Sequence, residues 1–319
     1  MWGEFLTEEL IKAGNHPVLF NRGKRNPDLF PELRRITGDR LTSDLKQIAN
    51  QSWDVVVDFS CMFPDNLEEI IVMLRGKVSR YIFVSTASVY PFDNAELWKS
   101  PVNENTETLP CTPEQRADKD MISSYGEKKA ECERVLLDKD WLDSIIFRPA
   151  LIYGRYDPTD RFYYWLYKVK TQNEILIPDE GKFKATNTYS EDFAKLIQST
   201  VSIERHNKVY NSVTHLPVSL KKYLEITAKL LNKTPKFISA DWQFLEENKV
   251  EQWADLPLTL KGMDLVLDNS NLIADFPVTF QSFENSIKGC IDYYSSLGWP
   301  QPKYGLNPLK ERELLKKIS

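Results

Sequence analysis

Short, nearly continuous apolar runs alternate with segments of helical periodicity through the first half of this chain of 319 residues. The run at 54–59, Asp-Val-Val-Val-Asp-Phe, is β-branched and typical of a strand that is covered on both faces in a parallel sheet. The same reasoning predicts strands at 17–20, 35–37, 54–59, 81–85 and 144–147, and helices at 4–13, 41–50, 67–74 and 125–137. This alternation predicts an α/β fold with a doubly wound parallel sheet.

The composition changes beyond Gly154, where aromatic residues and isolated short elements become frequent. This change predicts a nucleotide-binding, Rossmann-type domain over residues 1–155 and a smaller C-terminal substrate lobe over 156–319. Segments near 187–213, with a helix at 191–199 and a strand around 209–211, are expected to return to the sheet. The polar stretch at 91–123 lacks periodicity and is long for a plain connection, so we expect a functional loop or insertion there.

A Rossmann-type fold normally opens with a strand, a glycine-rich turn and a helix whose amino terminus faces the pyrophosphate. In this sequence the helix at 4–13 comes at once, so the first strand is missing, and Gly3 stands where the third glycine of the turn would be. Two explanations are open: a start codon assigned downstream of the real one, or a true loss of the strand. We expect the first, because a sheet without a central strand exposes apolar edges and unpaired backbone groups.

Composition and charge exclude several classes of function. A formal net charge of −5 provides no overall attraction for polyanions, so nucleic acid is not an expected partner. Three histidines and four widely spaced cysteines give no metal-binding pattern and little material for a Ser-His-Asp triad. No apolar run approaches the roughly 20 residues of a membrane span. Reduced thiols are the simplest account of the cysteines, and they favour a cytosolic protein.

Tyr125 and Lys129 stand four residues apart in the predicted helix at 125–137, so their side chains project from the same face. A phenol has an ordinary pKa of about 10, and an adjacent ammonium group favours the phenolate and lowers that pKa. A tyrosine with a lowered pKa can transfer protons near neutral pH. Tyr and Lys at this spacing are also common on helix surfaces. The surrounding sequence therefore has to decide between a proton-transferring pair and an ordinary surface pair.

That surrounding sequence resembles the extended short-chain dehydrogenases/reductases of the epimerase/dehydratase kind, whose active helix reads Tyr-Gly-x-x-Lys-Ala-x-x-Glu. Two further matches follow the family's order: Thr86-Ala-Ser-Val-Tyr90 at the end of a strand, and Arg148-Pro149 followed by Tyr153-Gly154. The resemblance covers nearly the whole chain and includes segments 157–162 and 254–258, which look like those of a poorly characterised subgroup. The chain departs from the family in its missing glycines, in Pro91 and in a longer stretch between Thr86 and Tyr125.

The resemblance implies a role for each matching residue. Tyr125 would transfer a proton, Thr86 would hold the substrate oxygen, and Lys129 would bind the cofactor ribose, although Ser85 or Ser88 could replace Thr86. The remaining cofactor contacts that it implies come from Gly3, Asn21, Phe59, Ser60 and Pro149. The substrate contacts that we expect come from Thr86, Tyr90, Tyr153 and Arg161, although aromatic residues at such spacing are more often part of a core.

The choice of cofactor depends on the turn Asn21-Arg22-Gly23, which follows the strand at 17–20. An arginine there can pair with the 2′-phosphate of NADP, so we expect NADP in preference to NAD. The alternative is that Arg22 is an ordinary exposed turn residue. Asp39 resembles the family's adenine-contacting acid, and the alternative is a helix cap.

We therefore expect an NAD(P)-dependent oxidoreductase or epimerase that acts on a small carbonyl or sugar-like substrate, with Tyr125 as the acid and base. Ala87 and Ser88 stand where an acidic residue would indicate dehydration, so a dehydratase is not favoured. The alternative function is a non-catalytic, cofactor-sensing or RNA-associated relative with the same fold. The expected partner is a small molecule, and the expected assembly is a monomer or a homodimer.

Overall fold

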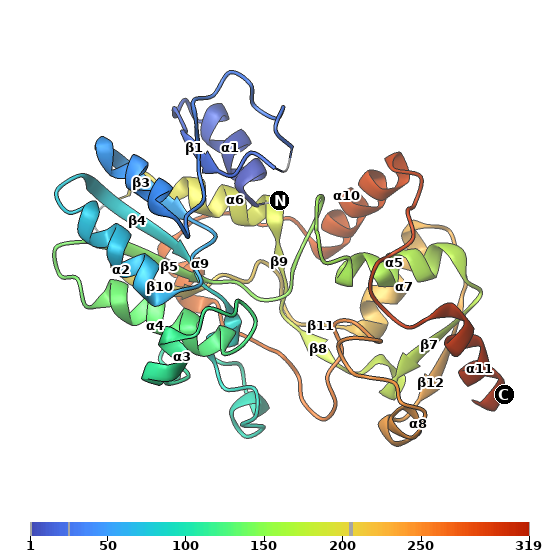
Figure 1. Ribbon diagram of the computed structural model, residues 1–319. Helices are drawn as coiled ribbons and strands as arrows, with labels where there is room; N and C mark the ends of the chain where they lie inside the picture. Colours follow the sequence, from blue (N-terminus) through green and yellow to red (C-terminus); the bar gives the residue numbers. More distant parts are fainter. Residues whose placement is uncertain (1, 25, 204–206, 319) are drawn as a thin grey trace.

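The computed structural model describes residues 2–24, 26–203 and 207–318, and Figure 1 shows the course of the chain. The elements of the first half are α1 (Trp2–Lys12), β1 (Leu19–Asn21), β2 (Arg35–Thr37), η1 (Ser43–Asn50), β3 (Trp53–Asp58), α2 (Pro64–Met73), β4 (Val78–Val84), η2 (Ala87–Val89), η3 (Leu97–Lys99), α3 (Pro113–Ala117), α4 (Tyr125–Leu137), β5 (Asp143–Arg148) and β6 (Ile152–Tyr153). The elements of the second half are α5 (Arg161–Thr171), β7 (Glu174–Pro178), η4 (Asp179–Gly181), β8 (Lys184–Ala185), β9 (Thr188–Tyr189), α6 (Ser190–Ser199), β10 (Lys208–Asn211), β11 (Val218–Ser219), α7 (Leu220–Leu230), β12 (Lys236–Ala240), α8 (Trp242–Glu247), α9 (Ser270–Asp275), α10 (Phe283–Ser296) and α11 (Pro308–Ile318).

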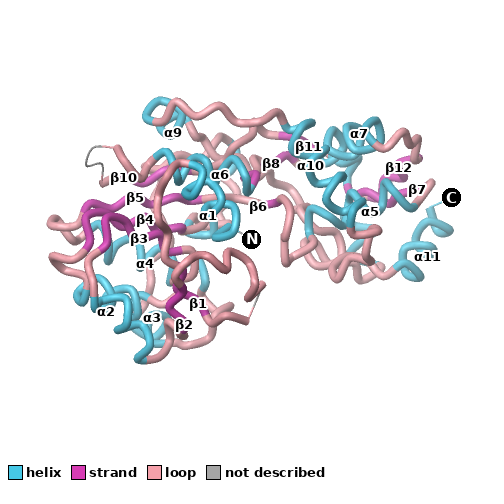
Figure 2. Tube along the Cα trace, turned by 90° about the horizontal axis from the view of Figure 1, so that it is seen from above, coloured by secondary structure: helices cyan, strands magenta, loops and turns pink. Residues whose placement is uncertain are grey.

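The main sheet has the strand order β10-β5-β4-β3, and every neighbouring pair is parallel. Helices α2 and α4 pack on one face of this sheet, while α1 and α6 pack on the other (Figure 2). All six residues of β5 are buried, as expected of a strand covered on both faces. The predicted α/β fold with a parallel sheet is confirmed, and β10 returns from residues 208–211 to pair with β5.

A second, separate sheet consists only of β1 and β2, which are parallel to each other. Among the described residues, β1 pairs only with β2 and β3 pairs only with β4. A cavity of about 740 Å³ lies between the two sheets and is lined from α1, β1 and β3 by Leu6, Leu10, Leu19, Phe20, Val55 and Val57 among others. In a doubly wound sheet of order 3-2-1-4-5-6, the first strand lies between the second and the fourth. The gap between β1 and β3 therefore lies at the position that the first strand has in that order.

Two local predictions needed correction. The helix expected at 41–50 is a 3₁₀ helix over Ser43–Asn50, and its N-cap is Thr42, whose hydroxyl accepts a hydrogen bond from the Asp44 amide. Asp39 is therefore not the cap of this helix. Gly3, expected to precede the first helix, lies in the first turn of α1, because this helix already begins at Trp2.

The second half of the chain has its own core, which is rich in aromatic side chains. Tyr163, Tyr164 and Trp165 of α5 are buried in it, and the Tyr163 ring stacks on Tyr294 with the ring centroids 3.7 Å apart. Strands β7 and β12 form a parallel pair beside these helices. Segment 270–280 returns to the first half, where Leu272 and Phe276 join the core under the main sheet. Within the described residues, no helix is long and apolar enough to cross a bilayer.

Candidate active site

Tyr125 and Thr86 lie together at the end of β4. Tyr125 is the first residue of α4, Thr86 follows the last buried residues of the strand, and the Thr86 hydroxyl is close enough to the phenol to act on its pKa. Gly126 permits this contact, because a Cβ atom on it would lie 2.1 Å from the carbonyl oxygen of Ser88. Helix α4 can therefore begin directly against the η2 turn. The structure thus brings together two of the three residues expected to be catalytic.

The neighbouring serines have other partners. The Ser85 hydroxyl is buried and donates to the Glu133 carboxylate at 2.5 Å. The Thr86 hydroxyl oxygen accepts from the Ser88 amide at 3.1 Å and the Thr86 hydroxyl donates to the Ser88 hydroxyl at 3.3 Å, so both groups of Ser88 hold the Thr86 side chain. Thr86 is only partly buried. Of these three hydroxyl groups, Thr86 is therefore best placed to act with Tyr125.

Lys129 is buried, and its partners include backbone carbonyl groups and an aromatic ring. Its ammonium group donates to the carbonyl oxygens of Cys61 at 2.9 Å and Val84 at 2.7 Å, and it lies 3.9 Å from the centroid of the Phe83 ring. Burial lowers the pKa of Lys129. An ammonium group has three N–H donors, so one remains for a further partner.

The pKa of Tyr125 is raised, contrary to the lowering expected from Lys129. Burial of the phenol is the largest cause, while the nearby Thr86 hydroxyl and the positive charge of Arg161 act in the opposite direction. The spacing of four residues placed Tyr125 and Lys129 on one helical turn, but it did not determine the direction of either side chain. In this arrangement Arg161, and not Lys129, is the cation that acts on the phenol.

Tyr90 and Tyr153, expected to contact substrate, are fully buried. The Tyr90 hydroxyl accepts from Arg148 at 2.7 Å and donates to Asn211 at 2.8 Å. The Tyr153 hydroxyl bonds with that of Ser286 at 2.5 Å. Both phenols thus form hydrogen bonds with protein partners. Pro149 is also buried, and its carbonyl oxygen accepts from the Ala87 amide at 2.9 Å.

Residues expected to bind the cofactor gather around the gap between the two sheets. The cavity of about 740 Å³ is lined by four of them, namely Gly3, Asn21, Phe59 and Ser60. A Cβ atom on Gly3 would have no heavy atom within 4 Å among its surroundings, so the space beside the first turn of α1 is open. Arg22 and Asp39 lie outside this lining and form a loose ion pair at 3.8 Å, with the Arg22 side chain 63% exposed.

Arg40 and Asp58 form a buried ion pair in the same cavity that the sequence analysis missed. Arg40 donates to Asp58 at 2.6 Å and to the Ser60 hydroxyl at 3.1 Å, and the Tyr81 hydroxyl donates to Asp58 at 2.7 Å. Burial alone would raise the pKa of Asp58, but the Arg40 charge and these hydrogen bonds lower it to about 2. A carboxylate in an otherwise apolar strand is a signal for such a partner, because a buried charge needs one.

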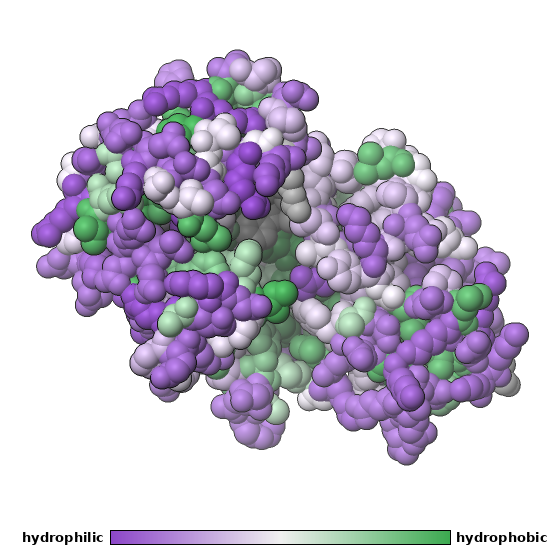
Figure 3. All heavy atoms as spheres, viewed as in Figure 1, coloured by the Kyte–Doolittle hydropathy of each residue, from purple (hydrophilic) through white to green (hydrophobic). Residues whose placement is uncertain are grey.

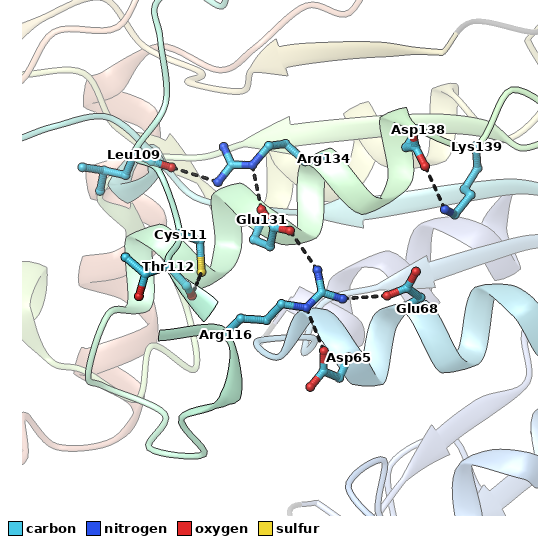
Figure 4. A network of polar contacts seen from close by, with 10 residues as sticks. All are labelled: Asp65, Glu68, Leu109, Cys111, Thr112, Arg116, Glu131, Arg134, Asp138 and Lys139. Atoms are coloured by element: carbon cyan, nitrogen blue, oxygen red, sulfur yellow. Dashed lines mark hydrogen bonds and ion pairs between the residues drawn. The ribbon is translucent and has the colours of Figure 1, made fainter. Parts of the chain in front are cut away.

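The insertion at 91–123 is attached to α2 and α4 by ion pairs (Figure 4). Arg116 of α3 donates to Asp65 at 2.9 Å, Glu68 at 2.6 Å and Glu131 at 2.8 Å. Arg134 donates to Glu131 and to the carbonyl oxygen of Leu109. The insertion thus packs against the helix that carries Tyr125.

In the second half of the chain, Arg161 begins α5 and is partly buried, with its guanidinium carbon 5.4 Å from the centroid of the Trp253 ring. A small apolar cavity of about 20 Å³ is lined by its neighbour in sequence, Phe162, and by residues including Leu151, Leu258 and Phe283. Figure 3 shows that the surface is hollowed between the two halves and that hydrophobic residues gather in the hollow.

Residues 61–211 match the family model described as "NAD dependent epimerase/dehydratase family". A curated relative, the chloroplast stem-loop binding protein of 41 kDa b from Arabidopsis thaliana, is 26% identical over 198 residues, which are 56% of this chain. The match spans 47% of that protein, about half its length.

Solved structures of epimerases share the fold along most of the chain. UDP-glucuronic acid 4-epimerase from Bacillus cereus in complex with NAD is 17% identical, with 93% of this chain and 96% of that chain covered and a TM-score of 0.68. UDP-glucose 4-epimerase from Thermus thermophilus in complex with NAD is 15% identical, with 92% and 96% covered and a TM-score of 0.67. WbmG from Bordetella bronchiseptica, in complex with NAD and UDP, is 17% identical, with 94% and 93% covered and a TM-score of 0.68.

Proposed function

We propose, from the membership of residues 61–211 in the NAD dependent epimerase/dehydratase family, that this chain is an NAD(P)-dependent oxidoreductase or epimerase. The observation that carries the proposal is the proximity of the Tyr125 and Thr86 hydroxyl groups at the end of β4, where Thr86 acts to lower the pKa of the phenol. It unites a proton-transferring group and an oxygen-holding group from two separate elements. Their substrate would be a small carbonyl or sugar-like molecule.

In this proposal Thr86 holds the substrate oxygen while Tyr125 gives or takes its proton. The raised pKa of Tyr125 means that the phenol is protonated at neutral pH, so it is ready to donate a proton to a carbonyl oxygen that is being reduced. When Tyr125 acts as a base, Arg161 stabilises the phenolate by its charge. The bound dinucleotide would supply or accept the hydride.

The residues around the cavity fit a dinucleotide in their chemistry. Gly3 leaves open space at the first turn of α1, and the amide donors of a helix N-terminus suit phosphate groups. Asn21 and Ser60 add polar groups at the ends of β1 and β3, and Phe59 adds an apolar surface. Lys129, with one free donor, and Pro149 would lie toward the reacting end.

We propose NADP in preference to NAD, because Arg22 follows β1 with an exposed guanidinium that is held only by a loose ion pair to Asp39. A 2′-phosphate would give it a closer, charge-assisted partner. Three similar solved structures are named as complexes with NAD, which favours the other choice and makes the preference worth measuring.

The test compares Tyr125→Phe with Tyr304→Phe, a control at an exposed tyrosine. The wild type is assayed with NADPH or NADP on UDP-glucose, UDP-glucuronic acid and small carbonyl compounds, and product is identified by NMR. We expect Tyr125→Phe to lower kcat by about 10²–10⁴ and to leave the unfolding temperature unchanged. Near-normal turnover by Tyr125→Phe contradicts the proposal. The product also separates the reductase from the epimerase: a reductase consumes NADPH and gives a product reduced by two electrons, whereas an epimerase gives an isomer of the substrate and regenerates the dinucleotide.

A second candidate function is binding of an RNA stem-loop, which the name of the curated relative favours. The net charge of −5 opposes it, because nonspecific RNA binding depends on neutralising phosphates. Fluorescence anisotropy with an RNA hairpin tests it, with a DNA hairpin of the same sequence as control. Tight, salt-dependent binding by a chain without turnover would favour this function over the enzyme.

We also propose a cytosolic protein that acts as a monomer or homodimer, with a domain boundary near residue 155. All four cysteines are free thiols, which suits a reducing compartment. Light scattering after size exclusion measures the assembly, and limited proteolysis near residue 155 tests the boundary.

A further inference from the structure

Two segments singled out in the sequence, 157–162 and 254–258, meet on the substrate side of the molecule. Arg161 of the first segment lies over the ring of Trp253, which directly precedes the second, at 5.4 Å from the ring centroid. The indole nitrogen of Trp165, on the same helix, donates to the carbonyl oxygen of Pro257 at 2.7 Å. The two segments therefore form one unit, with Arg161 supported from behind by an aromatic ring.

Arg161 differs from other arginines in the interior. Arg148 and Arg40 each have a carboxylate partner at 2.6 Å, whereas Arg161 has neither an ion pair nor a hydrogen bond within the described part of the chain. Asp157 is close enough for the Arg161 charge to lower its pKa, against the raising effect of burial, but the two form no ion pair. A partly buried guanidinium without an anion is incompletely solvated, so it favours an anionic ligand.

The backbone around this arginine is held in unfavourable conformations. Tyr156, Asp160 and Trp253 have φ angles of 62°, 55° and 66°, which place these residues in the left-handed region. Each such residue costs about 1–3 kcal/mol, and residues of this kind cluster at ligand-binding sites. The strained residues stand on both sides of the Arg161 and Trp253 contact, so the geometry of this contact is maintained at a cost in stability.

Arg161 also acts on the candidate catalytic pair. Its positive charge lowers the pKa of Tyr125, partly offsetting the effect of burial, so the guanidinium and the phenol lie within electrostatic reach of each other. Arg161 is the first residue of α5, and the free amides at this end of an 11-residue helix also favour negative charge.

We propose that Arg161 binds a carboxylate or phosphate group of the substrate, while Tyr125 and Thr86 hold the reacting oxygen of the same molecule. The proposal rests on the proposed function for the position of the reacting oxygen. The planar guanidinium packs one face on Trp253 and leaves its edge for two parallel hydrogen bonds to an anion. The substrate class is therefore an alcohol or carbonyl compound that carries an anionic group near the reacting carbon.

The test measures binding by calorimetry with three matched sugars: glucose, glucuronate, which adds a carboxylate, and glucose 1-phosphate, which adds a phosphate. The variants are Arg161→Met, Arg161→Lys and a control, Lys170→Met. Lys170 lies on the same helix, over the ring of Trp299 at 5.6 Å, and is exposed. Circular dichroism and the unfolding temperature verify that each variant is folded.

We expect the wild type to bind one anionic sugar at least about tenfold more tightly than glucose. Arg161→Met should remove this preference, Arg161→Lys should retain part of it, and Lys170→Met should leave it unchanged. The preferred sugar identifies the anion as carboxylate or phosphate. Equal or undetectable binding of all three sugars, or a preference that persists in folded Arg161→Met, overturns the proposal. Because binding is measured without turnover, these results are independent of the Tyr125→Phe test of the proposed function.

Discussion

The two ends of the candidate site differ in how completely their buried polar groups and strands are paired. Around Tyr125, the polar groups behind the phenol are buried and paired, from Ser85 through Glu133 and Arg148 to Tyr90. Around the expected dinucleotide site, β1 and β3 each lack a neighbour among the described strands, and a cavity of about 740 Å³ separates them. The region around Tyr125, where we propose catalysis, is called the catalytic end, and the region of the unpaired strands, where we propose dinucleotide binding, is called the dinucleotide end.

The two ends are held in place by different contacts, and these contacts differ in whether they involve the unpaired strands β1 and β3. The catalytic end depends on β4, β5 and α4, which pack against one another through side chains on both faces of the main sheet. The dinucleotide end depends on β1 and β2, which form a sheet of their own and, among the described strands, are not paired with β3. We therefore expect substitutions at the catalytic end to affect stability strongly, and changes at the dinucleotide end to affect mainly cofactor binding.

The largest expected effect comes from Glu133→Gln at the catalytic end. This change leaves the buried Arg148 guanidinium without its counter-charge, and breaking a buried pair typically costs about 3–5 kcal/mol. Denaturant unfolding measures the loss. Glu96→Gln, in an exposed pair with Lys99, is the control and should change stability by no more than about 0.5 kcal/mol. Similar losses for both variants would remove the distinction between the two ends.

The sequence predicted the catalytic end better than the dinucleotide end for a physical reason. Helical periodicity and a buried apolar run predicted that Tyr125 begins a helix and that Thr86 follows a strand, and the resemblance to the family predicted that the two residues act together. Local pattern does not determine where a long side chain points, so the interaction of Lys129 with the carbonyl oxygens of Cys61 and Val84 was not predicted.

Contacts between segments that are distant in the sequence also could not be predicted from the sequence pattern. Arg40 and Asp58 are 18 positions apart, and nothing in their local sequence identifies them as partners. Tyr90 matches the family's motif, but only the packing of β5 and β10 shows that its hydroxyl is shared between Arg148 and Asn211. A motif indicates that a residue matters and does not distinguish a substrate contact from a buried support.

The next largest effect is the pH dependence of stability that the Asp58 carboxylate contributes at the dinucleotide end. The folded pKa of about 2 lies below the unfolded value of about 3.9, so the ionised carboxylate stabilises the fold fully above that unfolded value. This contribution, roughly 2 kcal/mol, is lost as the pH falls toward 2. Between pH 5 and pH 3, Asp58→Asn should therefore lose less stability than the wild type, as measured by urea unfolding. Asp54→Asn, at an exposed position in the same strand, is the control. Equal pH dependence of wild type and Asp58→Asn would show that the ion pair contributes nothing to stability.

A smaller effect should come from supplying the strand that the sheet lacks. An N-terminal fusion of a short β-branched segment and a glycine-rich turn should insert between β1 and β3 and tighten NADPH binding by about tenfold, or about 1.4 kcal/mol. Glycine allows the backbone to approach the pyrophosphate, and a well-placed turn directs the amide donors of α1 at it. Calorimetry measures the affinity. A fusion of equal length with proline at alternate strand positions is the control, because proline cannot complete the hydrogen-bond ladder. Equal affinity of the unextended chain and the glycine-containing fusion would place the phosphate site elsewhere.

The smallest effect should be that of Arg22→Ala on the choice between the two dinucleotides. The Arg22 side chain is 63% exposed, so its pairing with a 2′-phosphate is weakened by water and salt, and we expect a preference for NADPH over NADH of only about three- to tenfold. The variant should lose this preference by binding NADPH more weakly, while its affinity for NADH stays the same, because NADH lacks the phosphate. Fluorescence titration at two salt concentrations measures both affinities, and the preference should shrink as salt increases. Arg34→Ala, which removes an exposed arginine that donates to Gln51, is the control for a general loss of positive charge. If the wild type binds both dinucleotides equally, or NADH more tightly, Arg22 is an ordinary turn residue, and the dinucleotide end lacks a specific phosphate contact as well as a strand.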